Sequence, residues 1–265
     1  MPSPAAAPRY EVSTVDAGAA RISVRSAGEG KPLVLLPGLG RSTRDLDGLA
    51  AILVGAGRRV ILPEPRGIGA STGPLEGITL HDLARDVGAV IEATGAAPAT
   101  IVAHAFGNRV ARCLAADRPE LVAAVVLLSA SGKVQPSPAI AEAIRLAQAV
   151  DTPPDVRRRA AKAAWFSGDN DPTPWLDGWS QPVMKAFLAA AAATDTAHWW
   201  TAGRARMLVV QGLDDVSAPP GNGRSIKAEV GARATLVELA GVGHALALED
   251  PAKVAGAVLD WLRAG

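Results

Sequence analysis

The sequence predicts an α/β fold in which helices cover both faces of a mainly parallel β-sheet. Short apolar stretches, such as residues 32–36 and 59–62, alternate with helical segments over the first half of the chain. Because these stretches are apolar at nearly every position, they are typical of strands buried on both faces. The pattern is interrupted after residue 131 and resumes at residues 207–211. A chain of 265 residues is long enough for one large α/β domain.

Local signals predict the N-terminal elements. Residues 10–26 alternate in polarity around an Asp-Ala-Gly turn and indicate an antiparallel hairpin at one edge of the sheet. Ser42 and Asp45 have the spacing of a capping box for the next helix, and Thr79 and Asp82 have the same spacing before a later one. The apolar residues of that later helix recur at helical spacing: Leu80, Leu83, Val87, Val90 and Ile91.

Residues 132–203 do not continue the alternation of strands and helices. Prolines divide this segment into short helices: Pro136, Pro138, Pro153, Pro154, Pro172, Pro174 and Pro182. The segment is therefore predicted to be a helical cap inserted after the sixth strand. We expect residues 1–8 to form a disordered tail, and residues 9–131 together with 204–265 to form the core domain.

The sheet pattern returns after the cap. Strands are predicted at residues 207–211 and 235–239. Asp250 as N-cap and Pro251 in the first turn open a closing helix. Its apolar residues face inward: Val254, Val258, Leu259 and Leu262.

Composition and charge exclude several classes of partner. The 27 Lys and Arg residues nearly balance the 26 Asp and Glu residues, and no basic block is present, so we expect neither nucleic acid nor a membrane surface as partner. The first residues lack the features of a signal peptide, and no apolar run approaches the roughly 20 residues that span a bilayer. We therefore expect a cytoplasmic protein. The single cysteine, Cys113, is expected to be a buried small hydrophobe.

The segment at residues 100–113 organises the predicted site. It reads as a buried strand, a sharp turn and a helix, and the small residues Ala103 and Gly107 flank the turn. The run Ala-His-Ala-Phe-Gly at residues 103–107 resembles the nucleophile elbow, Gly-x-Ser-x-Gly, of the α/β-hydrolase fold family. The resemblance covers nearly the whole chain and implies an eight-stranded-type sheet with a helical cap. Ala105 stands at the nucleophile position and has no atom able to attack a carbonyl.

Two further residues match the acid and the base of this family. The loop at residues 211–219 is similar to the family's Gly-x-x-Asp-x-x-x-Pro loop, which makes Asp215 the match and Asp214 its neighbour. His244 follows the last strand, where the family places its histidine. A carboxylate behind an imidazole fixes its tautomer and stabilises the imidazolium. The alternative is that Asp215 only caps a turn and that His244 is a loop histidine.

The resemblance also implies an oxyanion hole made of two backbone N–H groups. One belongs to Phe106, the residue after the nucleophile position. The other belongs to Leu39, because Pro37-Gly38-Leu39 resembles the family's His-Gly-x, and Gly38 is expected beside the substrate. Such donors contribute roughly 3–4 kcal/mol to the stabilisation of an acyl-transfer transition state.

The cap supplies the remaining candidates for substrate contact. These are the five tryptophans of the segment and one histidine: Trp165, Trp175, Trp179, His198, Trp199 and Trp200. So many indoles over a cleft favour a bulky apolar or aromatic small organic molecule as substrate. The alternative is that these indoles form the core of the cap. His104 is expected to support the site, and His81 to lie on the surface. No His, Cys or carboxylate residues have metal-ligand spacing in the sequence and no phosphate loop is present, so neither a metal nor a cofactor is expected.

Three interpretations of Ala105 follow. The chain is an inactivated form of a serine hydrolase; or it uses His244 and Asp215 as a general base without a serine, as a lyase, isomerase, decarboxylase, cofactor-free oxygenase or water-activating enzyme; or it is a non-catalytic binding protein. Taken together, the sequence favours a hydrolase acting on an ester, a lactone or an activated carbon–carbon bond. The oligomeric state cannot be predicted from the sequence.

Overall fold

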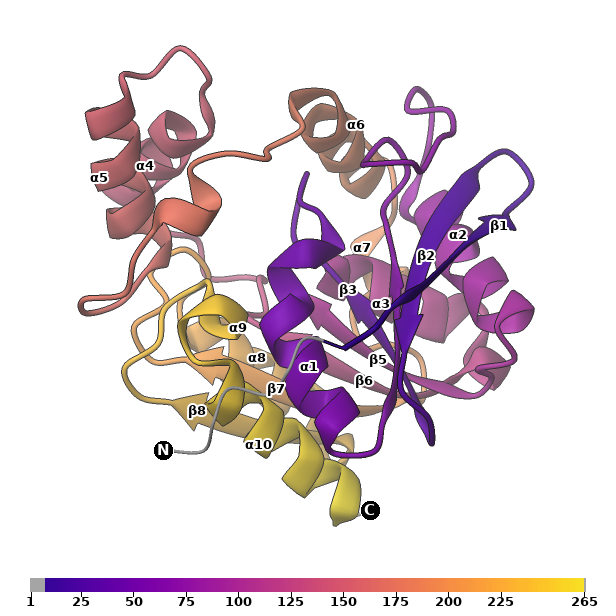
Figure 1. The fold of residues 1–265 in the computed structure, drawn as a ribbon. Coiled ribbons are helices and arrows are strands. Elements are labelled where there is room, and N and C mark those ends of the chain that lie inside the picture. The colour runs from indigo at the N-terminus through magenta and orange to yellow at the C-terminus, as the bar shows by residue number, and fades with distance from the viewer. Residues whose placement is uncertain (1–7, 265) are drawn as a thin grey trace.

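A computed structural model describes residues 8–264 of the chain (Figure 1). The predicted tail at residues 1–8 therefore lies outside the described residues except for its last position. The strands are β1 (Glu11–Asp16), β2 (Arg21–Ala27), β3 (Pro32–Leu36), β4 (Arg59–Pro63), β5 (Ala99–His104), β6 (Val122–Leu128), β7 (Arg206–Gly212) and β8 (Ala234–Leu239). The helices are α1 (Asp47–Gly55), α2 (Leu80–Ala93), α3 (Gly107–Asp117), α4 (Pro138–Gln148), α5 (Pro154–Trp165), α6 (Gln181–Ala192), α7 (Thr196–Trp199), α8 (Gly221–Val230), α9 (Leu246–Glu249) and α10 (Pro251–Arg263). The short 3-10 helices are η1 (Thr43–Leu46), η2 (Pro119–Leu121), η3 (Thr173–Trp175) and η4 (Gly231–Arg233).

The eight strands form one sheet in the order β1-β2-β4-β3-β5-β6-β7-β8. β1 and β2 are antiparallel to each other and β2 is antiparallel to β4, whereas all other neighbours are parallel. This confirms the predicted fold class, including the hairpin at the sheet edge. In the turn between β1 and β2, the Asp16 carboxylate accepts a hydrogen bond from the Gly18 N–H at 2.8 Å, and Gly18 has a φ of +77°.

Helices cover both faces of the sheet because successive strand residues point to opposite sides. In β3, Leu33 and Leu35 pack with α1 and α10 on one face, whereas Val34 and Leu36 pack with α2 and α3 on the other. All four side chains are at most 4% exposed, which explains why the strand is apolar at every position. Figure 1 shows α1 and α10 side by side on the near face.

The two predicted capping boxes have different outcomes. Thr79 and Asp82 form one at the start of α2, where the Asp82 carboxylate accepts the Thr79 N–H at 2.8 Å. The box of Ser42 and Asp45 was predicted wrongly. Ser42 caps only η1, and the Asp45 carboxylate binds the guanidinium of Arg41 at 2.8 Å instead. The charged partner, one helical turn away, is the stronger competitor for this carboxylate.

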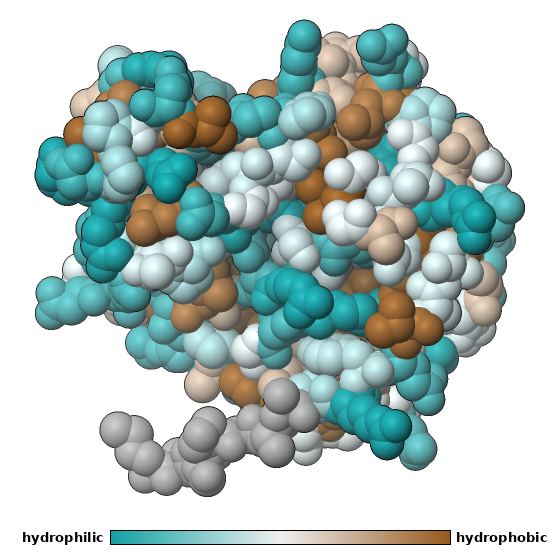
Figure 2. All heavy atoms as spheres, turned by 45° about the horizontal axis from the view of Figure 1, so that its top comes forward, coloured by the Kyte–Doolittle hydropathy of each residue, from teal (hydrophilic) through white to brown (hydrophobic). Residues whose placement is uncertain are grey.

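The segment between β6 and β7 contains α4, α5, η3, α6 and α7. α4, α5 and η3 share a small apolar cluster with Ala245, which follows β8, and in Figure 1 they stand apart from α6, above the end of the sheet. α6 and α7 instead contribute Val183, Phe187 and Trp199 to the main core cluster. Polar and apolar side chains are mixed over the face seen in Figure 2. None of the described helices combines the length and the apolar character needed to cross a membrane.

Candidate active site

The turn between β5 and α3 has the geometry of a nucleophile elbow. Ala105 has a φ of +47°, in the left-handed region that side chains other than glycine rarely adopt. A Cβ on Gly107 would lie 2.7 Å from the carbonyl oxygen of Pro37 and 3.1 Å from Leu36. Only glycine fits at Gly107, because the helix starts in contact with the loop after β3. The chain therefore keeps a strained turn that presents residue 105, with alanine in that place.

We predict that Ala105→Gly stabilises the protein. An L-residue in the left-handed region costs about 1–2 kcal/mol, and glycine relieves this strain at an entropic cost of about 0.5–1 kcal/mol. The free energy of unfolding should therefore rise by roughly 0.5–1 kcal/mol. Urea denaturation measures it as a higher midpoint with an unchanged m-value. Gly107→Ala serves as the opposite control and should destabilise, and a lower midpoint for Ala105→Gly would show that the turn is not strained.

Asp215 and His244 form a hydrogen-bonded pair from two loops at the same end of the sheet. Asp215 follows β7 and His244 follows β8, and Nδ1 of His244 lies 3.0 Å from Oδ2 of Asp215. The Asp215 carboxylate is buried and also accepts the N–H groups of Ser217 at 3.0 Å and Ala218 at 2.7 Å. These contacts fix the carboxylate behind the ring. With the Nδ1 proton directed at Asp215, Nε2 of His244 is left to accept a proton.

Asp214, the neighbour of Asp215, points elsewhere. Its carboxylate accepts a hydrogen bond from the Ser167 hydroxyl at 2.5 Å on the exposed side of the loop. The structure thus brings Asp215, and not Asp214, to His244.

His104 holds the backbone of the catalytic histidine candidate. Its Nε2–H donates to the carbonyl of His244 at 2.9 Å, and the Ser129 hydroxyl donates to the same oxygen at 2.9 Å. Burial, and secondarily the neighbouring His244, lowers the pKa of His104 to about 3. His104 therefore stays neutral at neutral pH and acts as a fixed hydrogen-bond donor.

We predict that His104 makes the protein sensitive to acid. Its pKa is lower in the folded state than the ordinary 6.5, so only the unfolded chain takes up this proton between about pH 6.5 and pH 3. The contribution of His104 to the free energy of unfolding is complete above about pH 6.5. It falls by up to about 1.4 kcal/mol per pH unit as the pH is lowered. His104→Gln keeps a donor but cannot titrate, so its unfolding free energy should fall less between about pH 6 and pH 4. Urea titrations at several pH values measure both slopes, and equal slopes would contradict the prediction.

A cavity of about 190 Å³ opens beside Ala105 and His244. It is lined by the loop after β3, the elbow, α3, α4, α6 and aromatic residues of the segment between β6 and β7. The lining residues are Gly38, Leu39, Arg41, His104, Ala105, Phe106, Arg109, Ser131, Ile144, Gln148, Trp165, Trp175, Trp179, Leu188, Ser217, Ala218 and His244. Trp175 packs against both histidines, with ring centroids 5.7 Å from His104 and 6.2 Å from His244. The predicted elbow, base and half of the predicted cap residues thus meet at one cavity.

Two backbone N–H groups at this cavity have no acceptor. Among residues 8–264, no backbone or side-chain oxygen accepts a hydrogen bond from the N–H of Leu39 or of Phe106. Both residues line the cavity together with Ala105, and a Cβ built on Gly38 would lie 3.8 Å from the Ala105 methyl. Two donors are therefore available beside residue 105.

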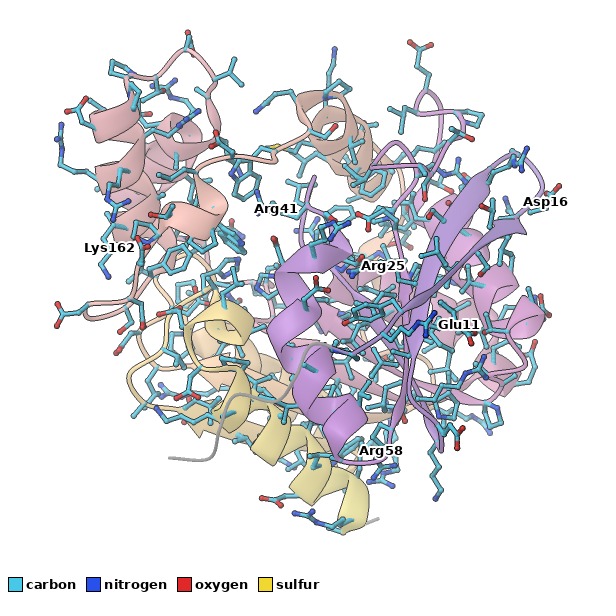
Figure 3. The ribbon with its side chains drawn as sticks, viewed as in Figure 1. Glu11, Asp16, Arg25, Arg41, Arg58 and Lys162 are labelled. Atoms are coloured by element: carbon cyan, nitrogen blue, oxygen red, sulfur yellow. The ribbon has the colours of Figure 1, made fainter. Side chains whose placement is uncertain are left out.

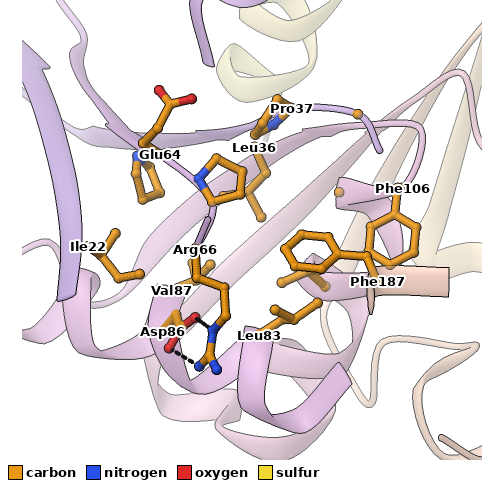
Figure 4. A pocket seen from close by; sticks show the side chains of 15 residues that line it. Ile22, Leu36, Pro37, Glu64, Arg66, Leu83, Asp86, Val87, Phe106 and Phe187 are labelled. Atoms are coloured by element: carbon orange, nitrogen blue, oxygen red, sulfur yellow. Dashed lines mark hydrogen bonds and ion pairs between the residues drawn. The ribbon is translucent and has the colours of Figure 1, made fainter. Parts of the chain in front are cut away.

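A smaller apolar pocket of about 40 Å³ lies behind the elbow (Figure 4). It shares Gly38 and Phe106 with the larger cavity, and the Phe106 ring stacks on Phe187 of α6 at 5.5 Å. Arg66 and Asp86 form a buried ion pair at 2.7 Å on its wall. Phe106 thus forms part of the wall of both spaces.

Comparison with known proteins shows the family of this chain. The family model described as alpha/beta hydrolase fold matches residues 31–169. The chain belongs to the α/β-hydrolase fold family. It is 30% identical over 249 residues to "Putative non-heme bromoperoxidase BpoC" of Mycobacterium tuberculosis, which covers 88% of this chain and 94% of that protein. It is 37% identical to "Putative carbamate hydrolase RutD" of Variovorax paradoxus over 111 residues, 42% of each chain.

Solved structures show the same fold. The crystal structure of BpoC from Mycobacterium tuberculosis superposes with a TM-score of 0.77 at 29% identity and covers 92% of this α/β-hydrolase and 96% of that chain. A thermophilic esterase from Thermogutta terrifontis superposes with a TM-score of 0.76 at 21% identity, covering 96% of this chain and 98% of that one. The second likeness concerns the fold alone.

Three residues predicted to contact substrate do not lie at the cavity of this α/β-hydrolase. Trp199 and Trp200 pack on the buried guanidinium of Arg112, each with its ring centre 4.7 Å away. His198 lies 2.6 Å from the Asp117 carboxylate. α7 packs against α3, so the two indoles are buried between this segment and the core, and His198 lies beside Asp117, away from the cavity.

Two arginines at the cavity were missed in the sequence. Arg41 reaches from the loop after β3 toward η3 (Figure 3), where its guanidinium binds the carbonyls of Asp177 and Pro174 and lies 4.7 Å from the Trp179 ring. Arg109 has no carboxylate partner anywhere in residues 8–264. Arg109 is four residues after Ala105, about one helical turn further along the chain, and this spacing could have identified it as a residue near the site.

Proposed function

We propose that this α/β-hydrolase cleaves an ester, a lactone or an activated carbon–carbon bond of a bulky, mainly apolar molecule, with water as the nucleophile. The observation that carries the proposal is the His244–Asp215 pair at a cavity where Ala105 offers no side-chain nucleophile. A general base within reach of a water molecule removes the need for a covalent intermediate.

The proposed reaction has an ordered set of steps, each carried out by named residues. Nε2 of His244 takes a proton from water while the water oxygen bonds to the substrate carbonyl, and Asp215 stabilises the imidazolium that forms. The N–H groups of Leu39 and Phe106 stabilise the negative charge on the carbonyl oxygen by roughly 3–4 kcal/mol per well-placed donor. The imidazolium then returns the proton to the leaving group as its bond to the carbonyl carbon breaks.

Cavity composition supports the substrate class. Trp165, Trp175 and Trp179 give the cavity an apolar aromatic wall. Arg109 adds a positive charge, so the site also suits a substrate with an anionic substituent. The name of the carbamate hydrolase relative describes hydrolysis, in line with the proposal. BpoC is named for an oxidation, and the proposal rests on the acid–base pair rather than on any name.

A comparison with His244→Gln tests the proposal. Both forms are assayed on a panel of aryl esters and lactones in isotopically labelled water. We expect the parent chain to hydrolyse members of the panel at least about 100-fold faster than the variant, because general-base catalysis contributes about 10²–10⁴. The label should enter the acid product while the mass of the protein stays unchanged.

Two results would count against the proposal. Equal rates for the two forms would show that His244 is not the base. An acylated protein would show a covalent route, and Ser131 is the hydroxyl to test because it lines the cavity. An adduct that disappears in Ser131→Ala would replace water with a relocated nucleophile.

A second candidate rests on the same lack of a nucleophile at Ala105. His244 could move a proton to or from carbon, as in an elimination, isomerisation, decarboxylation or cofactor-free oxygenation. Solvent-deuterium exchange into substrates with an acidic C–H, lost in His244→Gln, distinguishes this candidate from hydrolysis.

A further inference from the structure

A second cluster of reactive side chains lies away from the catalytic cavity, where α2, α3 and α7 meet. His81 belongs to the first turn of α2, Cys113 and Asp117 to α3, and His198 to α7. We propose that His81, Cys113 and Asp117 bind a divalent transition-metal ion of the Zn²⁺ type, with water as the fourth ligand. This site is separate from the proposed hydrolysis and does not depend on it.

The distances between the three ligand atoms are close to those of a tetrahedral site. Sγ of Cys113 lies 3.5 Å from Nδ1 of His81 and 3.6 Å from Oδ2 of Asp117. Zinc–ligand bonds of about 2.0–2.3 Å at tetrahedral angles place a sulfur about 3.5–3.6 Å from a nitrogen or oxygen ligand. Nδ1 of His81 and Oδ2 of Asp117 are 2.8 Å apart, and a tetrahedral ion requires about 3.3 Å. A shift of about half an ångström in one exposed side chain completes the geometry.

The secondary structure fixes these ligands in position. Cys113 and Asp117 are four residues apart on α3 and so lie on one face of the helix. α2 packs against that face and carries His81. The sequence did not reveal the cluster, because His81 lies on a different helix from Cys113 and Asp117. Nitrogen, thiolate and carboxylate ligands together are the set that zinc prefers.

His198 supports the ligand set from outside. Its Nε2 lies 2.6 Å from Oδ1 of Asp117, the carboxylate oxygen that does not face Cys113. A hydrogen bond to the second oxygen orients a ligating carboxylate, which is the usual role of an outer-shell partner. His198 therefore holds Asp117 in place, and the binding of an ion also strengthens the contact of α7 with α3.

The cluster combines a buried ligand with access from solvent. Cys113 is fully buried, whereas the side chains of His81 and Asp117 are 40% and 22% exposed. A surface cavity of about 190 Å³ is lined by His81 and Asp117, and also by Arg85 and Arg118. Both arginines are already paired, Arg85 with Asp82, and Arg118 with Glu92 and Glu120. Their charges are thus largely compensated near the ion.

The test uses Zn²⁺ and Co²⁺ with the full chain after treatment with a chelator. Co²⁺ should produce the near-ultraviolet charge-transfer band of a cobalt–thiolate bond. Zn²⁺ at about 100 times its Kd should raise the Tm by roughly 5–10 °C. Both signals should be lost in Cys113→Ser and in His81→Gln. His81 is partly exposed, so His81→Gln is expected to fold even if Cys113→Ser does not.

His244→Gln is the control for binding at the catalytic pair and should keep both signals. The proposal is overturned if Co²⁺ gives no thiolate band with the parent chain. It is also overturned if Zn²⁺ still raises the Tm of His81→Gln. Loss of the rise in Tm in His244→Gln would overturn it too, because it would place the ion at His244.

Discussion

Ala105→Ser is expected to raise the rate of aryl ester hydrolysis by at least about 10³-fold, because removing the serine of such a triad costs on the order of 10⁶. The elbow, the His244–Asp215 pair and the two N–H groups without acceptors are all present, so a hydroxyl at position 105 would restore the missing reactant. The two forms are compared side by side on aryl esters and lactones. Mass spectrometry of the intact protein should detect an acyl-enzyme only in the serine form.

Ala105→Gly provides the matched control for this gain. It changes the same strained position without adding a hydroxyl, so it should alter stability and leave the rate of hydrolysis low. If the serine form is no faster than the parent chain and forms no acyl-enzyme, the triad assignment loses its basis. Proton transfer by His244, or ligand binding without catalysis, would then be the function to pursue.

Asp215→Asn is expected to lower kcat by roughly 10³–10⁴-fold in the Ala105→Ser form. An amide at this position would donate a hydrogen bond to Nδ1 of His244 and so place the ring proton on Nε2, where a base needs a lone pair. The substitution also removes the charge that stabilises the imidazolium. The loss should appear in kcat measured on the best ester of the panel, with the circular dichroism spectrum unchanged.

Asp214→Asn is the control that the chain itself offers. Asp214 is adjacent in sequence and has the same side chain, yet its carboxylate binds Ser167 and not His244. Its substitution should leave kcat within about threefold of the parent, an energy difference below about 1 kcal/mol. Equal losses in both variants would show that the effect comes from the loop, and not from the orientation of His244.

Much of the fold and of the candidate site could be predicted from the sequence because both depend on local patterns. Strands such as β3 are apolar at every position since both faces are covered, and this signal requires no knowledge of the neighbours. The small residue Gly107 after Ala105 indicated the sharp turn that the φ of Ala105 confirms. Asp215 and His244 each follow a strand of one parallel sheet, so their loops had to meet at the same end.

Other features depended on which of several competing partners a side chain meets in the folded chain. Asp45 forms no capping box because its carboxylate makes a bidentate ion pair with Arg41 instead. Trp199 and Trp200 pack on Arg112 because a buried guanidinium has few ways to be satisfied, and aromatic faces are one of them.

The sequence by itself determined the fold class, and it predicted the sharp turn at Ala105 and the candidate pair of Asp215 and His244, because each depends on residue types within short stretches. Only the tertiary structure decided which tryptophans face the cavity, which arginines join them, and that His81 meets Cys113 and Asp117. Those outcomes depend on how helices from separate parts of the chain pack against one another. Helix packing is set by the sum of many weak contacts, and no single stretch of sequence contains that sum.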